Sequence, residues 1–326
     1  MEGCMNKKRK TGIIVLIVVI ALALLCALAS TALLITGKKN FNGEKPNKHF
    51  NSNKKDGYIA TLYIEGTIQD KNETYNQEWL LKTIKDLKKD SLNKGIAIFI
   101  NSPGGTVYEA DEIYLALQDY KTKAKPIYVY QGQIAASGGY YISCAGNKIY
   151  ANRNTLTGSI GVISASTFDM TDFLSNLGIK SSTIHSGKNK NMGNFNEPLS
   201  EEQKQILQSI ADECYKQFTD IVAMRRNIPI NDVKKLADGR IYTAKQALHN
   251  NLIDSIDSWE NMLNDMKNDE FEGKDLKLVE FRYKREKSFK DYIFGKTFKE
   301  QNDVCASIEK LFSNQKIQYP AYLYNY

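Results

Sequence analysis

The sequence predicts an α/β protein: a parallel sheet with flanking helices, preceded by one N-terminal transmembrane helix. From Tyr58 onward, short runs of β-branched and aromatic residues alternate with longer amphipathic segments. That repeated order is typical of a parallel sheet whose strands are joined by right-handed crossovers. Before it, residues 13–36 are uncharged and almost entirely apolar, which is typical of a membrane-spanning helix.

The N-terminal part divides by composition. Residues 1–12 include the basic run Lys7–Lys10, which favours a cytoplasmic N-terminus and places the rest of the chain outside the cytoplasm. Residues 13–36 form the predicted transmembrane anchor of a cell-membrane protein. A cleaved signal peptide is the alternative, since Ala27–Ser30 resembles a cleavage site, but the apolar run continues beyond it. Residues 37–56, rich in Lys, Asn and Gly, are the predicted linker.

Residues 57–260 are expected to form the main domain, and each element is predicted from its pattern. Period-two or continuous apolar runs predict strands, and apolar residues at three- and four-residue steps predict helices. A capping box opens the longest helix at Ser200. The predicted strands cover 58–64, 96–100, 127–130, 148–151 and 160–164, and the predicted helices cover 73–90, 107–120, a segment after Ser137, 200–226 and 243–250.

Two glycine-containing motifs, Asn101–Gly105 and Ala135–Tyr141, each follow a predicted strand. Separately, each is a common turn after a strand. Active sites of parallel sheets lie at the carboxyl ends of the strands, where both motifs fall. Ser137 has only Ala and Gly as neighbours and can present its hydroxyl, while glycines let backbone N–H groups approach a carbonyl oxygen. Together the motifs indicate a nucleophile and an oxyanion hole.

A serine nucleophile needs a base within hydrogen-bond reach. Of three histidines, His185 is the candidate, because it ends a strand-like run. A lysine is the alternative, although a lysine acts as a base near neutral pH only where burial lowers its pKa. Residues 181–196 contain Lys188 and Lys190 but no Asp or Glu, so this segment is expected to pack inward.

Three further segments complete an ordered set: Thr157–Val162, Ser186–Gly193 and Gly239–Thr243. With the two motifs above, they resemble the signal peptide peptidase A family of membrane-anchored serine proteases. The resemblance runs from about Tyr58 to about Ile256. It implies a fold similar to those of caseinolytic protease ClpP and crotonase, a homo-oligomer, and cleavage of hydrophobic peptides such as remnant signal peptides.

The same resemblance assigns roles to residues. It implies that Ser137 is the nucleophile, that Lys190 is the general base, and that Ser159 orients the lysine. The backbone N–H groups of Gly105 and Gly138 would form the oxyanion hole of an acyl-enzyme reaction that needs no cofactor. Lys188 occupies a variable position of the pattern and is expected to be a solvated charge.

Other functions lack support in the sequence. No phosphate-binding loop or metal-ligand spacing occurs, and nothing in the net charge of +7 indicates nucleic-acid binding. The five scattered cysteines argue against a disulfide framework. The alternative to a protease is a non-proteolytic crotonase-fold scaffold or binding module at the membrane.

The C-terminal extension, residues 261–326, is loosely patterned, with one predicted strand at 276–283. It ends in the aromatic tail Tyr319–Tyr326, which has no charged side chain. Such a tail either packs on the core or adds to a sheet edge beside the nucleophile, as a substrate peptide would.

Overall fold

The computed structural model describes residues 57–285 and, for the backbone alone, residues 321–323. The predicted anchor and linker and most of the C-terminal extension lie outside the described residues. None of the helices within the described part is long and apolar enough to cross a membrane.

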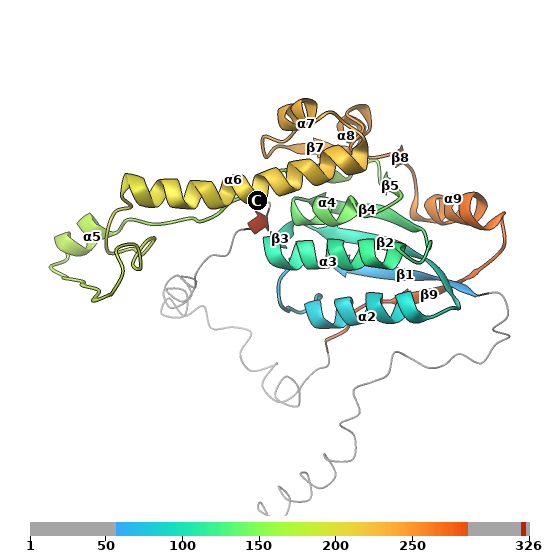
Figure 1. Cartoon of the computed structure of the whole chain (residues 1–326), viewed down its shortest axis with the longest axis horizontal. Coiled ribbons are helices and arrows are strands. Elements are labelled where there is room, and N and C mark those ends of the chain that lie inside the picture. Colours follow the sequence, from blue (N-terminus) through green and yellow to red (C-terminus); the bar gives the residue numbers. More distant parts are fainter. Residues whose placement is uncertain (1–56, 286–320, 324–326) are drawn as a thin grey trace, which may run out of the picture. The chain divides into compact units, whose positions relative to one another are not determined.

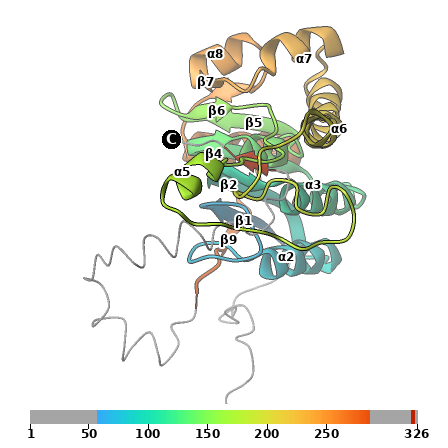
Figure 2. The same ribbon diagram turned by 90° about the vertical axis from the view of Figure 1, so that its left-hand side faces the viewer.

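A mostly parallel sheet forms the centre of the domain. Its main path runs β7-β6-β4-β2-β1-β9, an order that Figure 2 shows from top to bottom, and β5 pairs with both β4 and β8. Only the β6–β7 pair is antiparallel in this sheet. The strands are β1 Tyr58–Glu65, β2 Asn93–Ser102, β4 Ile127–Ala136, β5 Lys148–Ala151, β6 Leu156–Gly158, β7 Ile241–Thr243, β8 Ser255–Ile256 and β9 Lys277–Phe281.

A second, two-stranded antiparallel sheet pairs β3 (Gly104–Thr106) with β10 (Ala321–Leu323). Helices α2, α3 and α4 lie side by side across one face of the main sheet (Figure 1). The helices are α2 Gln77–Lys89, α3 Val107–Lys121, α4 Gly138–Ser143, α5 Thr171–Asn176, α6 Glu201–Arg226, α7 Ile230–Leu236, α8 Ala244–His249 and α9 Trp259–Phe271.

Strand alternation builds a core on each face of the sheet. In β1, Ala60, Leu62 and Ile64 point to the face covered by α2 and α3, whereas Ile59 joins the cluster under α9. Since side chains alternate with period two, one strand supplies both clusters. Helix α9 and strand β9 thus belong to the same domain, which continues past residue 260.

The predicted parallel sheet is confirmed, but the strand expected at 160–164 is wrong. The strand here is β6, and it ends before Ser159, whose φ of 49° is left-handed and cannot continue an extended strand. Strand β4 is longer than predicted and reaches Ala136.

Helix α6 is only partly covered. Its C-terminal half buries Phe218, Thr219 and Val222, whereas Ile210 is exposed in its N-terminal half. Residues 164–200, which we call the arm, extend away from the sheet alongside that exposed half (Figure 1). Large apolar side chains of the arm are exposed: Phe168, Phe173, Leu177, Ile179 and Ile184.

Candidate active site

The structure brings the two glycine motifs together at the carboxyl ends of neighbouring strands. Strands β2 and β4 pair in parallel, and Ser102 lies opposite Ala135. A Cβ at Gly139 would lie 2.9 Å from the carbonyl oxygen of Ser102, so only glycine allows this approach. The second motif therefore packs directly against the first.

Ser137 occupies a strained turn between β4 and α4. Its φ of 53° and ψ of −115° are unusual for a residue with a side chain, and only 1% of its surface is exposed. Its N–H donates to the carbonyl oxygen of Gly158 at 2.7 Å. Such strain costs about 1–3 kcal/mol and clusters at active sites. A sharp strand-to-helix turn is the geometry by which α/β hydrolases expose a nucleophilic serine.

Two backbone N–H groups that the sequence singled out lie near this turn. Gly138 is the first residue of α4, where a helix has no acceptor of its own for the N–H. Ile68 bonds to Gly104 and Thr106, so Gly105 turns its own N–H and carbonyl to the opposite side of the strand. A Cβ at Gly105 would lie 1.7 Å from the oxygen of Ile68, so glycine is required there.

Ser159 lies beside the nucleophile because Gly158 pairs with Ala136 and accepts the N–H of Ser137. Its N–H donates to the carbonyl oxygen of Arg240 at 2.8 Å, and the residue is buried. The Gly239–Thr243 motif therefore has a structural role: it holds the Ser159 turn in place.

Lys190 is not brought to Ser137 within one chain. It lies on the arm, where its side chain is exposed, and in the described part of the chain that side chain forms no hydrogen bond or ion pair. The expectation that this segment packs inward is wrong for the single chain. Lys188 is exposed as predicted and pairs with Glu202 at the start of α6.

Other candidate nucleophiles and bases near the site are weak. Cys144 is fully buried, and burial raises the pKa of its thiol to about 12, so it stays neutral. His185 is exposed on the arm, where its ring Nδ1 contacts the carbonyl oxygen of Gly187. Within residues 57–285, no group of His, Cys, Asp and Glu is arranged to hold a metal ion.

The end of the chain lies against the site. Strand β10 pairs antiparallel with β3, with Tyr322 opposite Gly105 and Leu323 opposite Gly104. It therefore lies on the side of β3 to which the N–H of Gly105 is turned. Residues 321–323 of the aromatic tail therefore add to a sheet edge beside the nucleophile.

Sequence reasoning missed the polar contacts that surround α4. The hydroxyl of Tyr141 donates to Asp111 at 2.6 Å and accepts from Gln217 Nε2 at 2.7 Å. Arg225 donates to the carbonyl oxygens of Cys144 and Gly146, in the turn that follows α4. These pairs join residues that are far apart in the sequence, so no sequence motif predicts them.

A serine at a strained strand-to-helix turn, beside glycine N–H groups, defines the class of serine hydrolases. The sequence model of peptidase family S49 matches residues 119–271. A putative signal peptide peptidase SppA from Enterococcus faecium is 38% identical over 238 residues, which cover 71% of this chain and 68% of that protein. The chain belongs to the signal peptide peptidase A family, peptidase family S49, and is a serine peptidase.

Two further similarities cover less of this chain. Protease 4 of Salmonella typhi is 33% identical over 203 residues, which cover 61% of this chain and 32% of that protein. Among solved structures, a mutant of ClpP1 from Listeria monocytogenes is similar, with a TM-score of 0.43 and 19% sequence identity. That similarity covers 62% of this chain and 94% of the ClpP1 chain.

Proposed function

We propose that the protein is a membrane-anchored endopeptidase that cleaves hydrophobic peptides, such as remnant signal peptides, through a Ser137–Lys190 dyad. The observation that carries this proposal is the strained turn at Ser137, held against Gly158 and beside the N–H groups of Gly105 and Gly138. Strand β3 offers extended peptides a backbone edge, as its pairing with β10 illustrates.

The chemistry follows the acyl-enzyme route. Ser137 Oγ attacks the scissile carbonyl carbon while its proton passes to Lys190 Nζ, and the N–H groups of Gly105 and Gly138 stabilise the resulting oxyanion. The C–N bond then breaks, and Lys190 returns the proton to the leaving amine. Water hydrolyses the serine ester. Ser159, which is buried beside the nucleophile, would accept a hydrogen bond from the lysine ammonium and orient it.

Lys190 reaches the nucleophile, we propose, in a homo-oligomer. Within one chain Lys190 is exposed on the arm, so a neighbouring copy must supply it to each Ser137. The arm and the N-terminal half of α6 expose apolar side chains that a second copy would cover. Exposed apolar patches of this kind are typical of interaction surfaces.

We propose that residues 13–36 anchor the chain in the membrane and that the domain lies outside the cytoplasm. A catalytic domain tethered by a short linker stays within reach of peptides that leave or remain in the membrane. That position suits apolar, extended substrates. Neither nucleic acid nor a cofactor has a part in this proposal.

A fluorophosphonate probe tests the proposed function. Such a reagent forms a covalent bond only with an activated serine. We expect labelling of the full-length protein in detergent at Ser137, identified by peptide mass spectrometry, and no labelling of Ser137→Ala. An unlabelled wild-type protein that is folded and oligomeric would favour the alternative, a non-proteolytic scaffold.

The labelling rate should also depend on pH. An amine accepts a proton only in its neutral form, so the rate should rise with pH along one limb as the lysine of the assembled site loses its proton. Measuring the rate constant from pH 5 to pH 10 checks this. A limb centred near the ordinary histidine pKa of about 6.5 would indicate an imidazole base instead.

The C-terminal tail should compete with added substrate. Because β10 occupies the edge of β3, deleting Tyr319–Tyr326 should raise the rate on a low concentration of an added apolar peptide several-fold. Tethering supplies the tail at a millimolar-order effective concentration. Mass spectrometry of the wild type and of Ser137→Ala reports whether the enzyme trims the tail. Unchanged activity on deletion, with an intact C-terminus in the active wild type, would contradict both roles.

A further inference from the structure

The helix that carries the nucleophile has its C-terminal end held by cations from other helices. Helix α4 has six residues and no basic residue in its last turn. Three successive carbonyl oxygens follow its last turn. Arg225 Nε donates to that of Cys144 at 3.0 Å, Lys121 Nζ to that of Ala145 at 3.3 Å, and an Arg225 Nη to that of Gly146 at 3.4 Å.

These contacts hold the turn that follows the helix. The backbone N–H groups of Cys144, Ala145 and Gly146 donate to carbonyl oxygens of α4, and the carbonyl oxygens of the same three residues accept from the two cations. The C-terminal end of a helix carries partial negative charge that favours nearby cations. Lys121 comes from the end of α3 and Arg225 from the end of α6. Burial, and after it the positive charge of Arg225, lower the pKa of Lys121 to about 8, in line with two cations crowded at one site.

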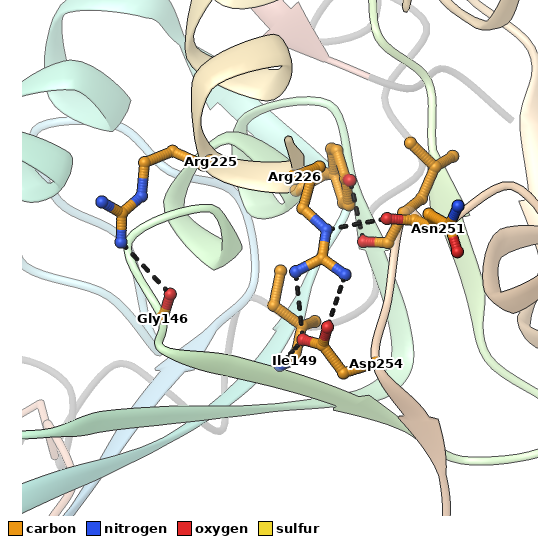
Figure 3. Close-up of polar contacts among 8 residues, drawn as sticks. Gly146, Ile149, Arg225, Arg226, Asn251 and Asp254 are labelled. Atoms are coloured by element: carbon orange, nitrogen blue, oxygen red, sulfur yellow. Dashed lines mark hydrogen bonds and ion pairs between the residues drawn. The ribbon is translucent and has the colours of Figure 1, made fainter. Parts of the chain in front are cut away.

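Arg226, the next residue of α6, holds the end of this helix and with it Arg225 in position. Arg226 forms a two-pronged ion pair with Asp254, with distances of 2.7 and 3.0 Å, and its Nε donates to the carbonyl oxygen of Asn251 (Figure 3). Asp254 also accepts the backbone N–H of Ile149, the second residue of β5. The side chain of Arg226 is 9% exposed. The last turn of α6 is therefore bonded to the sheet through Arg226 and Asp254. This contact also holds the backbone of Arg225, whose side chain extends to the turn after α4.

Helices α3 and α6 also contact the middle of α4. Tyr141 bonds to Asp111 of α3 and to Gln217 of α6, and its ring meets Phe218 edge-on at a centroid distance of 5.0 Å. At its other end, α4 begins at the strained Ser137, which has no side-chain cap. A strained residue keeps its conformation only where the surroundings over-determine it.

We propose that Arg225 and Lys121 are positioning residues for catalysis: by holding the carbonyls of residues 144–146, the turn that ends α4, they fix the Ser137 hydroxyl and the Gly138 N–H in the reactive geometry. The inference rests on the proposed function of Ser137. Neither residue touches substrate, so their loss slows the chemical step and leaves peptide binding at the β3 edge unchanged.

The test measures fluorophosphonate labelling of the full-length protein as a function of probe concentration. Arg225→Met should lower the maximal labelling rate constant about tenfold, because small misplacements of a nucleophile are costly, and leave the half-saturating concentration within about twofold. Lys121→Met should lower it less, and Arg225→Lys should restore most of the loss. Lys216→Met, which removes an exposed cation of the same helix, is the matched control and should match the wild type.

Thermal unfolding shows whether each variant is folded. If Arg225→Met does not fold, Lys121→Met carries the test. A folded Arg225→Met or Lys121→Met with the wild-type maximal rate would overturn the proposal and leave the cations a purely structural role. A change in half-saturation alone would overturn it as well. A wild type unlabelled at Ser137 would overturn the proposed function and this inference with it.

Discussion

Replacing Ser137 or Lys190 by alanine should each abolish hydrolysis of an apolar peptide, with a loss of about 10³-fold or more. Ser137→Ala removes the attacking oxygen, and Lys190→Ala removes the group that accepts its proton. Both variants should fold as the wild type does. Ser137 lies in a turn fixed by its backbone, and Lys190 is exposed without a partner among the described residues. Peptide turnover and thermal unfolding of the purified full-length variants measure both properties.

Lys188→Ala is the matched control for Lys190→Ala. It removes a lysine two positions away in the same loop, at the cost of an exposed ion pair with Glu202, and such surface pairs contribute little to stability. It should keep most of the activity. The reverse outcome, an inactive Lys188→Ala and an active Lys190→Ala, would show that the register is wrong. Loss of activity in His185→Ala alone would argue for an imidazole base.

Two inactive variants should restore activity when they assemble together. If Lys190 of one copy serves Ser137 of the next, co-expressed Ser137→Ala and Lys190→Ala chains combine an intact serine with an intact lysine at some interfaces. Random assembly in equal amounts should give about one quarter of the wild-type activity per site, because each site needs one chain of each kind in a fixed order. Turnover by the purified mixed oligomer measures the recovery.

The control for this experiment joins Ser137→Ala chains with chains that carry both substitutions, which offer no intact serine and should stay inactive. Absence of recovery from the first mixture, in oligomers shown by mass spectrometry to contain both chains, would place the dyad within one chain. The arm would then have to fold back over its own sheet.

The fold could be predicted where local pattern and tertiary packing agree. The strand at 148–151 has the predicted bounds, and α6 begins at the predicted capping box. Strand β4 was predicted too short because Gly132, Ala135 and Ala136 are weak strand formers. In the folded domain a Cβ at Gly132 would lie 2.9 Å from the ring of Phe99, so the absence of a side chain is what lets this strand pack.

For the site, the sequence predicted the nucleophile turn and the glycine strand ends, but not which other segments lie beside them. Small neighbours identified Ser137, and glycines identified the strand ends, because both are local steric properties. The direction of the arm is not local. A segment without carboxylates was expected to turn inward, but Glu202, outside that segment on α6, pairs with Lys188 and leaves this loop in solvent. Contacts such as Arg225 with Cys144 join residues 81 positions apart and leave no trace in spacing.

Helix α6 connects the exposed arm at its N-terminal end to the buried helix α4 at its C-terminal end. It has 26 residues, so it is about 39 Å long. Its first turn is bound to the arm through Lys188 and Glu202, and its last turn is bound to the nucleophile helix through Arg225. On the proposed arrangement, a newly made copy alone holds a serine without a base and a lysine without a serine. Such a copy would be a dormant precursor that becomes able to cleave peptides only once copies have met.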